Sequence, residues 1–324
     1  MATSISNLPP ASIDEAKKVY EHLTRSQCKP QLGALSFEVT GDTHALSFYF
    51  PILKMLSDVE SESFYQLIKE IAEHPNFDIQ LIGEGKETIT HQLPKSARYL
   101  VAGHLVEVFF FRQNILERFL STPRHFQLYT TLEAFHQDGS IMGGCYNPSR
   151  ECIQIVISRL FEGFNGDTPG VCPFLHELGH MLDHFDAGSG SIGRADGLYP
   201  GLSPQDGDIF NPRARELFLK GKRLELDRYL ARHHGDTSQP MPIGSPYVFQ
   251  NNGEFVAGYL EAFFRNPHYI ASQNEILFSA YKELFGYDPR KAWAEDFPHY
   301  VKKNREFYLS GKRPPKTGLS MPKD

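Results

Sequence analysis

The sequence predicts an α+β fold that is mainly helical in its C-terminal part. Apolar residues recur with helical spacing over much of the second half of the chain, and alternate with polar residues only in short stretches. Two such stretches, residues 140–146 and 151–158, flank an Asn-Pro turn and predict a β-hairpin. We expect an α+β N-terminal domain of unknown role at residues 1–120 and a mainly helical domain with a small β-sheet edge at residues 121–324.

The chain up to residue 120 alternates between helix and strand signals. Residues 98–120 are rich in apolar side chains, and their pattern fits a helix as well as a strand. The other predicted elements are a helix at 12–27 that starts with a capping-box pattern, a strand-like stretch at 33–50, a helix at 61–74 and a strand at 77–82.

The C-terminal half has clearer helix signals. A stretch rich in Gly, Pro, Asp and Ser at residues 186–212 separates the first two predicted helices, and a loop of this length is more often functional or mobile than idle. We expect His233, His234 and the Lys and Arg residues within 213–232 on a solvated helix face. The predicted helices cover residues 173–185, 213–232, 253–265, 273–285 and 296–310.

Charge and hydropathy argue against a nucleic-acid partner and against a membrane-spanning segment. Lys and Arg number 33 against 39 Asp and Glu, which gives a net charge of −6, so no global basic field favours a nucleic acid. The most apolar stretch, Tyr99 to Phe111, contains His104 and Glu107 and is shorter than the ~18–20 apolar residues that a bilayer requires. We therefore expect neither a nucleic-acid partner nor a membrane span.

The N-terminus and the cysteines bear on localisation. Residues 1–6 have neither a basic start nor an apolar core, so they do not predict a secretory signal peptide. Four cysteines in 324 residues are too few for a disulfide scaffold. We expect a cytoplasmic protein, or one exported without a cleaved signal peptide.

Residues 176–180 carry the clearest chemical signal, His-Glu-Leu-Gly-His. His176 and His180 are ~6 Å apart along a helix and share a face, so their imidazoles can bind one tetrahedral cation. Glu177 would lie beside that ion and accept a proton from water. The pattern also arises by chance with two surface or packed histidines. An apolar stripe at helical spacing and Gly179 within the helix favour the metal interpretation.

A third ligand must come from elsewhere in the chain. Cys172 is a candidate, but Pro173 suggests that it precedes the helix. Glu254 and Glu261 lie on a second predicted helix, and either would complete a His₂Glu site with an open fourth position, as catalytic zinc requires. Asn251 and Glu254 also fit a capping box. Spacing does not choose between the two glutamates.

A family resemblance does choose. His-Glu-Leu-Gly-His-x-x-Asp, then Tyr247, then a glutamate seven residues later followed by Phe-Val-Ala, resembles the catalytic domain of the anthrax lethal factor family, which includes the Pro-Pro endopeptidases. The helix expected from Pro298 to Tyr308 is similar to the closing helix of that domain. The resemblance covers residues 140–310 and implies a zincin-like metallopeptidase domain at residues 121–324.

The resemblance also implies a role for each matching residue. It assigns His176, His180 and Glu254 as ligands of one Zn²⁺ per chain, Glu177 as the general base and the Tyr247 hydroxyl as a group that assists the transition state. The family tends to have a second acidic residue four positions after the ligand glutamate, where this chain has Gly258. Glu261, one helical turn further on, is the candidate substitute.

We therefore expect a zinc metalloendopeptidase of the gluzincin type that acts on a protein or peptide, and the role of a bacterial toxin- or effector-like protease fits it as well as a housekeeping role. Gly143 and Gly144, in the predicted hairpin, would let an extended substrate add to the strand, although an ordinary glycine-rich strand end is the alternative. Two other functions fit the residues. One is a zinc hydrolase for a non-peptide amide or ester, and the other is a non-enzymatic binding or effector module whose zinc is structural or absent.

Overall fold

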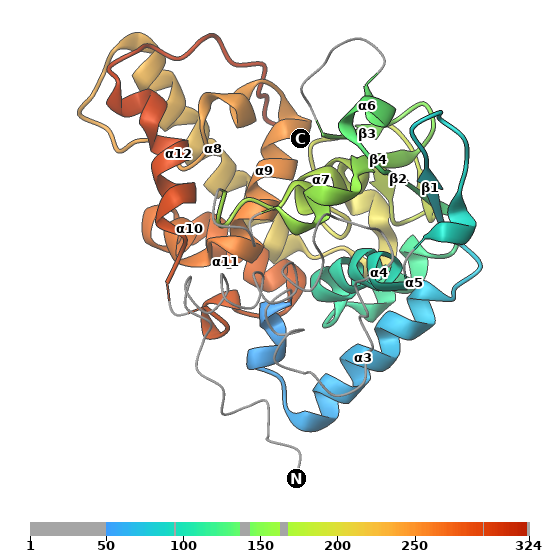
Figure 1. The fold of residues 1–324 in the computed structure, drawn as a ribbon. Coiled ribbons are helices and arrows are strands. Elements are labelled where there is room, and N and C mark those ends of the chain that lie inside the picture. Colours follow the sequence, from blue (N-terminus) through green and yellow to red (C-terminus); the bar gives the residue numbers. More distant parts are fainter. Residues whose placement is uncertain (1–49, 94, 137–142, 163–167, 294, 323–324) are drawn as a thin grey trace. The chain divides into compact units, whose positions relative to one another are not determined.

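The structure, a computed structural model, is an α+β fold (Figure 1). The helix expected at residues 12–27 and the strand-like stretch expected from residue 33, up to residue 49, lie outside the residues that it describes. The described residues are 50–93, 95–136, 143–162, 168–293 and 295–322.

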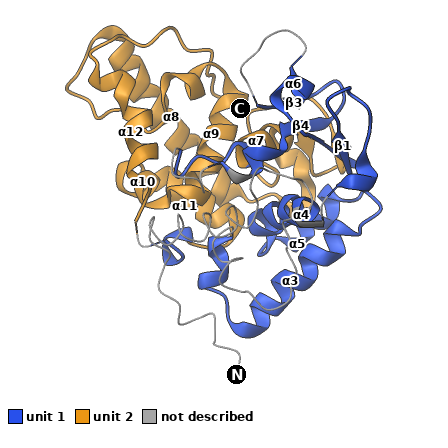
Figure 2. Cartoon of the chain, in the orientation of Figure 1, with its two compact units in different colours: residues 1–174, 289–294 blue, residues 175–288, 295–324 orange. Residues whose placement is uncertain are grey.

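The chain divides into two compact units (Figure 2). Unit 1 runs to Phe174 and includes residues 289–294, and unit 2 comprises residues 175–288 and the chain from Glu295 onward. The division falls near the start of one helix. The domain boundary expected between residues 120 and 121 lies inside unit 1, and it stays a prediction about how the chain is organised.

Unit 1 contains a four-stranded mixed sheet in the order β1-β2-β4-β3. β1, β2 and β4 are parallel, and β3 pairs antiparallel with β4 at one edge, which confirms the predicted hairpin. The strands are β1 Phe77–Ile82, β2 Arg124–Tyr129, β3 Gly144–Asn147 and β4 Cys152–Val156.

The two faces of this sheet differ in polarity. Phe126 of β2 is buried on one face, where its ring centroid lies 6.2 Å from that of Phe174. On the other face Gln154 donates to Gln127 at 2.7 Å and Gln127 donates to Gln80 at 3.3 Å, so amide side chains bridge three strands. This alternation is that of a sheet with one face in the core.

Helices supply the rest of unit 1. The ambiguous stretch at residues 98–120 is helical, and residues 100–110 are all buried, so no polar side marks it as an amphipathic helix. α3 confirms the helix expected at 61–74 and begins with a capping box between Ser57 and Glu60. The helices are α3 Asp58–Ala72, α4 Lys95–Phe109, α5 Gln113–Phe119 and α6 Leu132–Phe135.

Unit 2 is built mainly from helices. α8 packs along α11, and a Cβ on Gly221 of α8 would lie 2.6 Å from Cα of Leu277, so only glycine permits this approach. The elements, with α7 crossing the division after Phe174, are α7 Pro173–His184, β5 Phe185–Asp186, β6 Ser191–Ile192, α8 Pro212–His234, α9 Asn252–Arg265, α10 Pro267–Gln273, α11 Glu275–Phe285 and α12 Pro298–Leu309.

Five predicted helices match α7, α8, α9, α11 and α12, and α10 is additional. It is short and begins at Pro267, directly after Asn266 ends α9. Proline suits the first turn of a helix, because that turn leaves its backbone N–H groups without helical partners. Asn274 then separates α10 from α11 and caps α11 by accepting from the backbone N–H of Leu277 at 3.0 Å.

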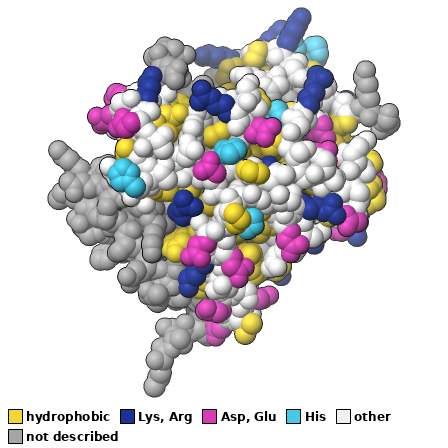
Figure 3. Space-filling model, turned by 90° about the vertical axis from the view of Figure 1, so that its right-hand side faces the viewer, with side chains coloured by type: hydrophobic (Ala, Val, Ile, Leu, Met, Phe, Trp, Pro, Cys, Tyr) yellow, Lys and Arg dark blue, Asp and Glu magenta, His cyan; other side chains and the backbone are white. Residues whose placement is uncertain are grey.

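None of the helices in the described ranges is long and apolar enough to cross a membrane. On the face of the molecule shown in Figure 3, described Lys and Arg side chains are interspersed with Asp and Glu. That face therefore carries no continuous patch of one charge sign.

Candidate metal centre

α7 carries its apolar and polar residues on different faces, as the sequence predicts. Leu178 and Met181 are fully buried, and Phe174 and Phe185 continue the same buried stripe. His176 and His180 lie on another face and are half-buried. The helix thus presents both imidazoles together where they remain accessible to solvent.

Three side chains from two helices of unit 2 converge into one group. His176 Nε2 lies 3.1 Å from Glu254 Oε2, and His180 Nε2 lies 3.5 Å from the same oxygen. One ligand atom from each of the three residues lies within 4.8 Å of the others, and in the described part of the chain no other His, Cys, Asp and Glu group meets that test. This donor set fits a metal ion, because two imidazoles and a carboxylate are a common set for catalytic zinc.

The start of α9 directs the carboxylate of Glu254 toward the histidines. Asn251 is the N-cap, and its side chain accepts from the backbone N–H of Glu254 at 2.9 Å. The Glu254 side chain does not complete a capping box and bonds instead with His176. Glu254 therefore takes part in both arrangements expected for it. Its backbone N–H donates to the Asn251 cap, and its carboxylate joins the two histidines.

Close packing of α7 against α9 fixes the separation of the ligands. A Cβ on Gly179 would lie 2.5 Å from Cα of Ala257, so only a glycine at this position lets the two helix backbones approach so closely. A Cβ on Gly253 would lie 3.2 Å from Asp183 Oδ2 and 3.4 Å from His180 Nδ1. Small residues on both helices therefore bring the histidines and Glu254 within reach of one ion.

Glu261 lies on the opposite side of the His176 ring from Glu254. Its Oε2 is 3.9 Å from His176 Nδ1, whereas Glu254 approaches Nε2. A carboxylate near the second ring nitrogen orients a ligand histidine and raises its basicity. The geometry therefore places Glu254 among the ligand atoms and Glu261 behind His176.

Gly258 has a packing role where the resembled family tends to have an acidic residue. A Cβ at this position would lie 2.4 Å from Cγ1 of Val248, the neighbour of Tyr247. The absence of a side chain on α9 therefore makes room for the segment that carries Tyr247. Glu261 supplies the carboxylate on that side of His176.

Tyr247 lies at the rim of the group. It belongs to the 3₁₀ turn η6, Pro246–Phe249, is 46% exposed and donates from its hydroxyl to Glu254 Oε1 at 3.0 Å. Partial burial and the charge of Glu254 raise the pKa of this hydroxyl, with a smaller contribution from Glu177. Tyr247 therefore stays a protonated hydrogen-bond donor at neutral pH.

The electrostatics of the group favour a carboxylate beside imidazoles. Burial alone would raise the pKa of Glu254, but hydrogen bonds with His176 and His180 outweigh it and lower that pKa to about 2. Burial opposes a charge on His176 as well, yet Glu254, Glu177 and Glu261 together raise its pKa. The group thus holds positive charge well, which also suits a cation.

Two other acidic residues of α7 lie close to the histidines in the chain. Glu177 follows His176 on α7 and is only 9% exposed. Asp183 is buried at the end of α7, where burial raises its pKa, and accepts from the backbone N–H of Gly197 at 2.6 Å. Asp183 therefore ties the loop after α7 to the helix that carries both histidines.

Three further candidates lie in unit 1 and do not join this group. Cys172 is buried just before α7 and is not among the residues that converge. Gly144 begins the edge strand β3, as expected. Gly143 has a packing explanation, because a Cβ there would lie 2.3 Å from Nε of Arg159. A substrate role for Gly143 and Gly144 stays a prediction.

The chain beyond α12 covers the segment between Tyr247 and Glu254. Thr317 Oγ1 donates to the carbonyl of Phe249 at 2.5 Å. Ser320 donates from its backbone N–H to Asn252 Oδ1 and accepts from Asn252 Nδ2, both at 3.0 Å. Residues 317–320, which we call the C-terminal strap, therefore hold the residues that precede the ligand glutamate.

Charged residues of α8 differ from the sequence prediction. Lys222, expected on a solvated face, is fully buried, and so is Glu225. Phe218 and Tyr229 are buried on the same helix at spacings of four and seven residues from these charges. The burial of Lys222 and Glu225 could have been predicted from this spacing, because a charged residue at a position in an apolar stripe faces the core.

Comparisons with known proteins leave the family open. A scan of the chain against family models finds no match, and no curated protein matches it either. Membership of the lethal factor family therefore stays a prediction from the motifs, and the convergence of His176, His180 and Glu254 is the finding that bears on function.

Proposed function

We propose that this protein is a zinc-dependent endopeptidase. The observation that carries the proposal is the convergence of two imidazoles and one carboxylate within 4.8 Å, from a His-Glu-x-x-His helix and a second helix. Zinc bound there would supply Lewis acidity, which makes water more acidic and polarises a scissile carbonyl. The metal is proposed as zinc because of this donor set.

The protein's own residues would move the proton and stabilise the developing charge. Glu177 is the general base, since it directly follows His176 on α7 and so lies beside the proposed metal group. It takes a proton from the attacking water and returns it to the leaving amine. Tyr247, protonated and half-exposed, donates a hydrogen bond to the carbonyl oxygen as it becomes an oxyanion.

Metal content tests the first part of the proposal. Wild-type protein should hold about one zinc per chain by mass spectrometry, and His176→Ala and Glu254→Ala should each lose it. His184→Ala is the matched control, because His184 lies on the same helix outside the group and should keep the metal. Zinc retained by Glu254→Ala would move the third ligand elsewhere, and Glu261→Ala would then be the next variant.

Peptide cleavage tests the second part. We expect the zinc-loaded protein to cleave members of a peptide library that includes proline-containing sequences, and Glu177→Gln to keep zinc while kcat falls by about 10²–10⁴. Cleavage of esters or non-peptide amides alone would favour the other hydrolase. Bound zinc without any hydrolysis, or with Glu177→Gln as active as wild type, would refute the peptidase mechanism.

A further inference from the structure

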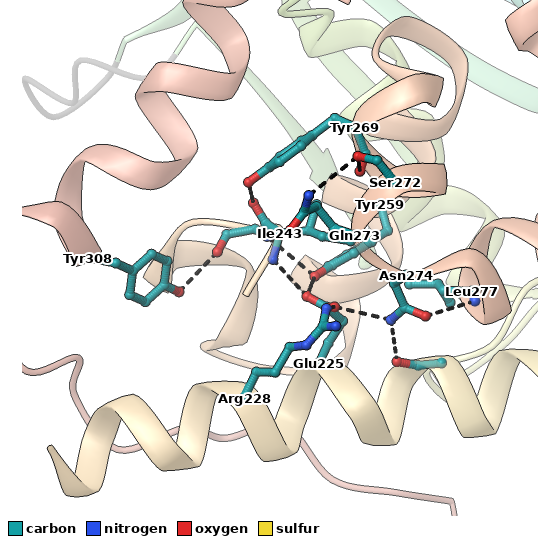
Figure 4. A network of polar contacts seen from close by, with 12 residues as sticks. Glu225, Arg228, Ile243, Tyr259, Tyr269, Ser272, Gln273, Asn274, Leu277 and Tyr308 are labelled. Carbon is teal, nitrogen blue, oxygen red and sulfur yellow. Dashed lines mark hydrogen bonds and ion pairs between the residues drawn. The ribbon is translucent and has the colours of Figure 1, made fainter. Parts of the chain in front are cut away.

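The three residues before the Tyr247 turn are held by side chains at every backbone group but one, and Figure 4 shows the part of this network around Ile243 and Glu225. Ile243, Gly244 and Ser245 belong to no helix or strand, yet successive groups bond to five different side chains. The bonds are Ile243 N–H to Glu225 at 2.7 Å, Tyr269 hydroxyl to Ile243 carbonyl at 3.2 Å, Gly244 N–H to Tyr259 hydroxyl at 3.3 Å, Tyr308 hydroxyl to Gly244 carbonyl at 2.9 Å, and Ser245 N–H to Asn304 at 3.1 Å.

The remaining group starts the turn itself. The carbonyl of Ser245 accepts from the backbone N–H of Val248 at 3.2 Å, which closes the first bond of η6 around Tyr247. Val248 in turn sits against two glycines, because Cβ atoms on Gly244 and Gly258 would lie 2.2 and 2.4 Å from its methyl groups. The backbone on both sides of Tyr247 therefore has little freedom.

Glu225 is the centre of this network. Its side chain has no exposed surface, and its two oxygens accept four hydrogen bonds, the full capacity of a carboxylate. Besides Ile243, the donors are the Tyr259 hydroxyl at 2.6 Å, Arg228 at 2.8 Å and Asn274 at 3.1 Å. These residues come from α8, α9 and α11 or its cap, so one buried charge joins three parts of unit 2 to the segment.

The position of Tyr247 depends on its backbone, because much of its side chain is exposed. It is 46% exposed, and its hydroxyl must lie within hydrogen-bond reach of a reacting carbonyl. We propose that the Glu225 network positions the Tyr247 hydroxyl, so that Glu225, Tyr259, Tyr269, Asn304 and Tyr308 are positioning residues for the reaction. This inference rests on the proposed function for the role of Tyr247, but the placement of Tyr247 can be measured without it.

Removal of one distant hydroxyl tests the inference kinetically. Tyr308→Phe deletes only the bond to the Gly244 carbonyl, and should lower kcat for peptide cleavage roughly three- to tenfold while KM changes less than about twofold. In a Tyr247→Phe background the same change should have no further effect on kcat. Tyr281→Phe is the matched control, because it removes a buried hydroxyl that bonds Tyr199 at 2.9 Å, and it should leave kcat unchanged.

A spectroscopic measurement separates this inference from the proposed function. With 3-fluorotyrosine at position 247, the ¹⁹F resonance should shift or broaden in Tyr308→Phe and stay unchanged in Tyr281→Phe. An unchanged resonance in Tyr308→Phe, or an equal fall in kcat with and without the Tyr247 hydroxyl, would overturn the inference. If wild-type protein with zinc cleaves no peptide, the proposed function fails, and the resonance then decides the placement by itself.

Discussion

Two glutamates of unit 2 have the same chemistry and opposite surroundings. Glu225 has no exposed side-chain surface, and its four acceptor positions are filled by donors from the protein. Glu254 keeps 15% of its side-chain surface exposed, and its partners are the two imidazoles and a tyrosine that a cation or a substrate can rearrange. Saturation marks a group that fixes structure, whereas accessible partners mark a group that can bind a ligand.

Replacing each glutamate by glutamine should give the largest difference between a structural and a metal-binding carboxylate. Glu225→Gln should lower the free energy of unfolding by about 3 kcal/mol, because it leaves Arg228 without its anion and places an amide donor against donors. Glu254→Gln should abolish stoichiometric zinc and should destabilise the metal-free protein less than Glu225→Gln does, because the new amide oxygen can still accept from the Tyr247 hydroxyl and its site keeps some exposure to water.

Urea unfolding in the presence of a chelator, with metal content measured in parallel, checks both expectations. Equal destabilisation by the two substitutions would contradict the contrast between a saturated and an open carboxylate. Zinc bound normally by Glu254→Gln would contradict the ligand assignment.

Lys222 is a second fully buried charge on α8, one turn before Glu225. It has fewer hydrogen-bond partners than Glu225. Its Nζ bonds Asn252 Oδ1 at 3.1 Å and lies 5.5 Å from the Phe255 ring centroid. Burial lowers the pKa of Lys222 to about 8, although Asp183 and Asp196 oppose this. Between pH 8 and about 10.5 the unfolded chain therefore holds the extra proton, and stability should rise with pH.

Lys222→Met should remove that pH dependence. The contribution of Lys222 is most favourable above the ordinary lysine pKa and is lost as pH falls toward 8, a change of about 3 kcal/mol. We therefore expect Lys222→Met to be at least as stable as wild type at pH 7, and its advantage to disappear by pH 10. Unfolding curves of both proteins at several pH values give the difference directly, and parallel pH profiles would refute the expectation.

Gly179→Ala should have the smallest effect on stability of these substitutions. It should act on the group around Glu254 rather than on the Glu225 network. The added methyl would lie 2.5 Å from Cα of Ala257, so α7 and α9 must separate, at a cost of about 1–3 kcal/mol. Zinc affinity should fall as the ligands move apart, while the Glu225 network keeps its bonds. Gly193→Ala, where a Cβ would meet its nearest atom at 3.9 Å, is a control for the substitution itself. Unchanged zinc affinity in Gly179→Ala would show that the helix separation does not set the ligand geometry.

The candidate site could be predicted from the sequence where local helix geometry decides. His176 and His180 follow from their spacing on an amphipathic helix, and that prediction needs no tertiary information. Glu254 and Glu261 could not be separated in this way, because both lie on α9 and spacing does not say which one meets the histidines. Their contacts in three dimensions separate them: Glu254 approaches Nε2 of both histidines, as the family resemblance implies, whereas Glu261 lies near Nδ1 of His176.

The fold was harder to predict where burial removes the periodic signal. Residues 100–109 of α4 are all buried, so this part of its sequence shows no polar face. β2 alternates, but Arg124 occupies one of its buried positions, with Nε bonded to the Phe119 carbonyl at 2.5 Å and the guanidinium 4.8 Å from the Phe119 ring. A charge in the core is possible only with such partners, which the strand itself does not reveal.

The order of events during synthesis follows from the bonds made by α12 and the C-terminal strap. Gly244 is held by a hydroxyl 64 positions later in the chain, and Phe249 and Asn252 by groups 68 positions later. The segment that carries Tyr247 and leads to Glu254 therefore emerges from the ribosome long before its supports do. A nascent chain would display His176 and His180 while Glu254 still moved freely, so retention of the proposed zinc would be among the last properties to appear.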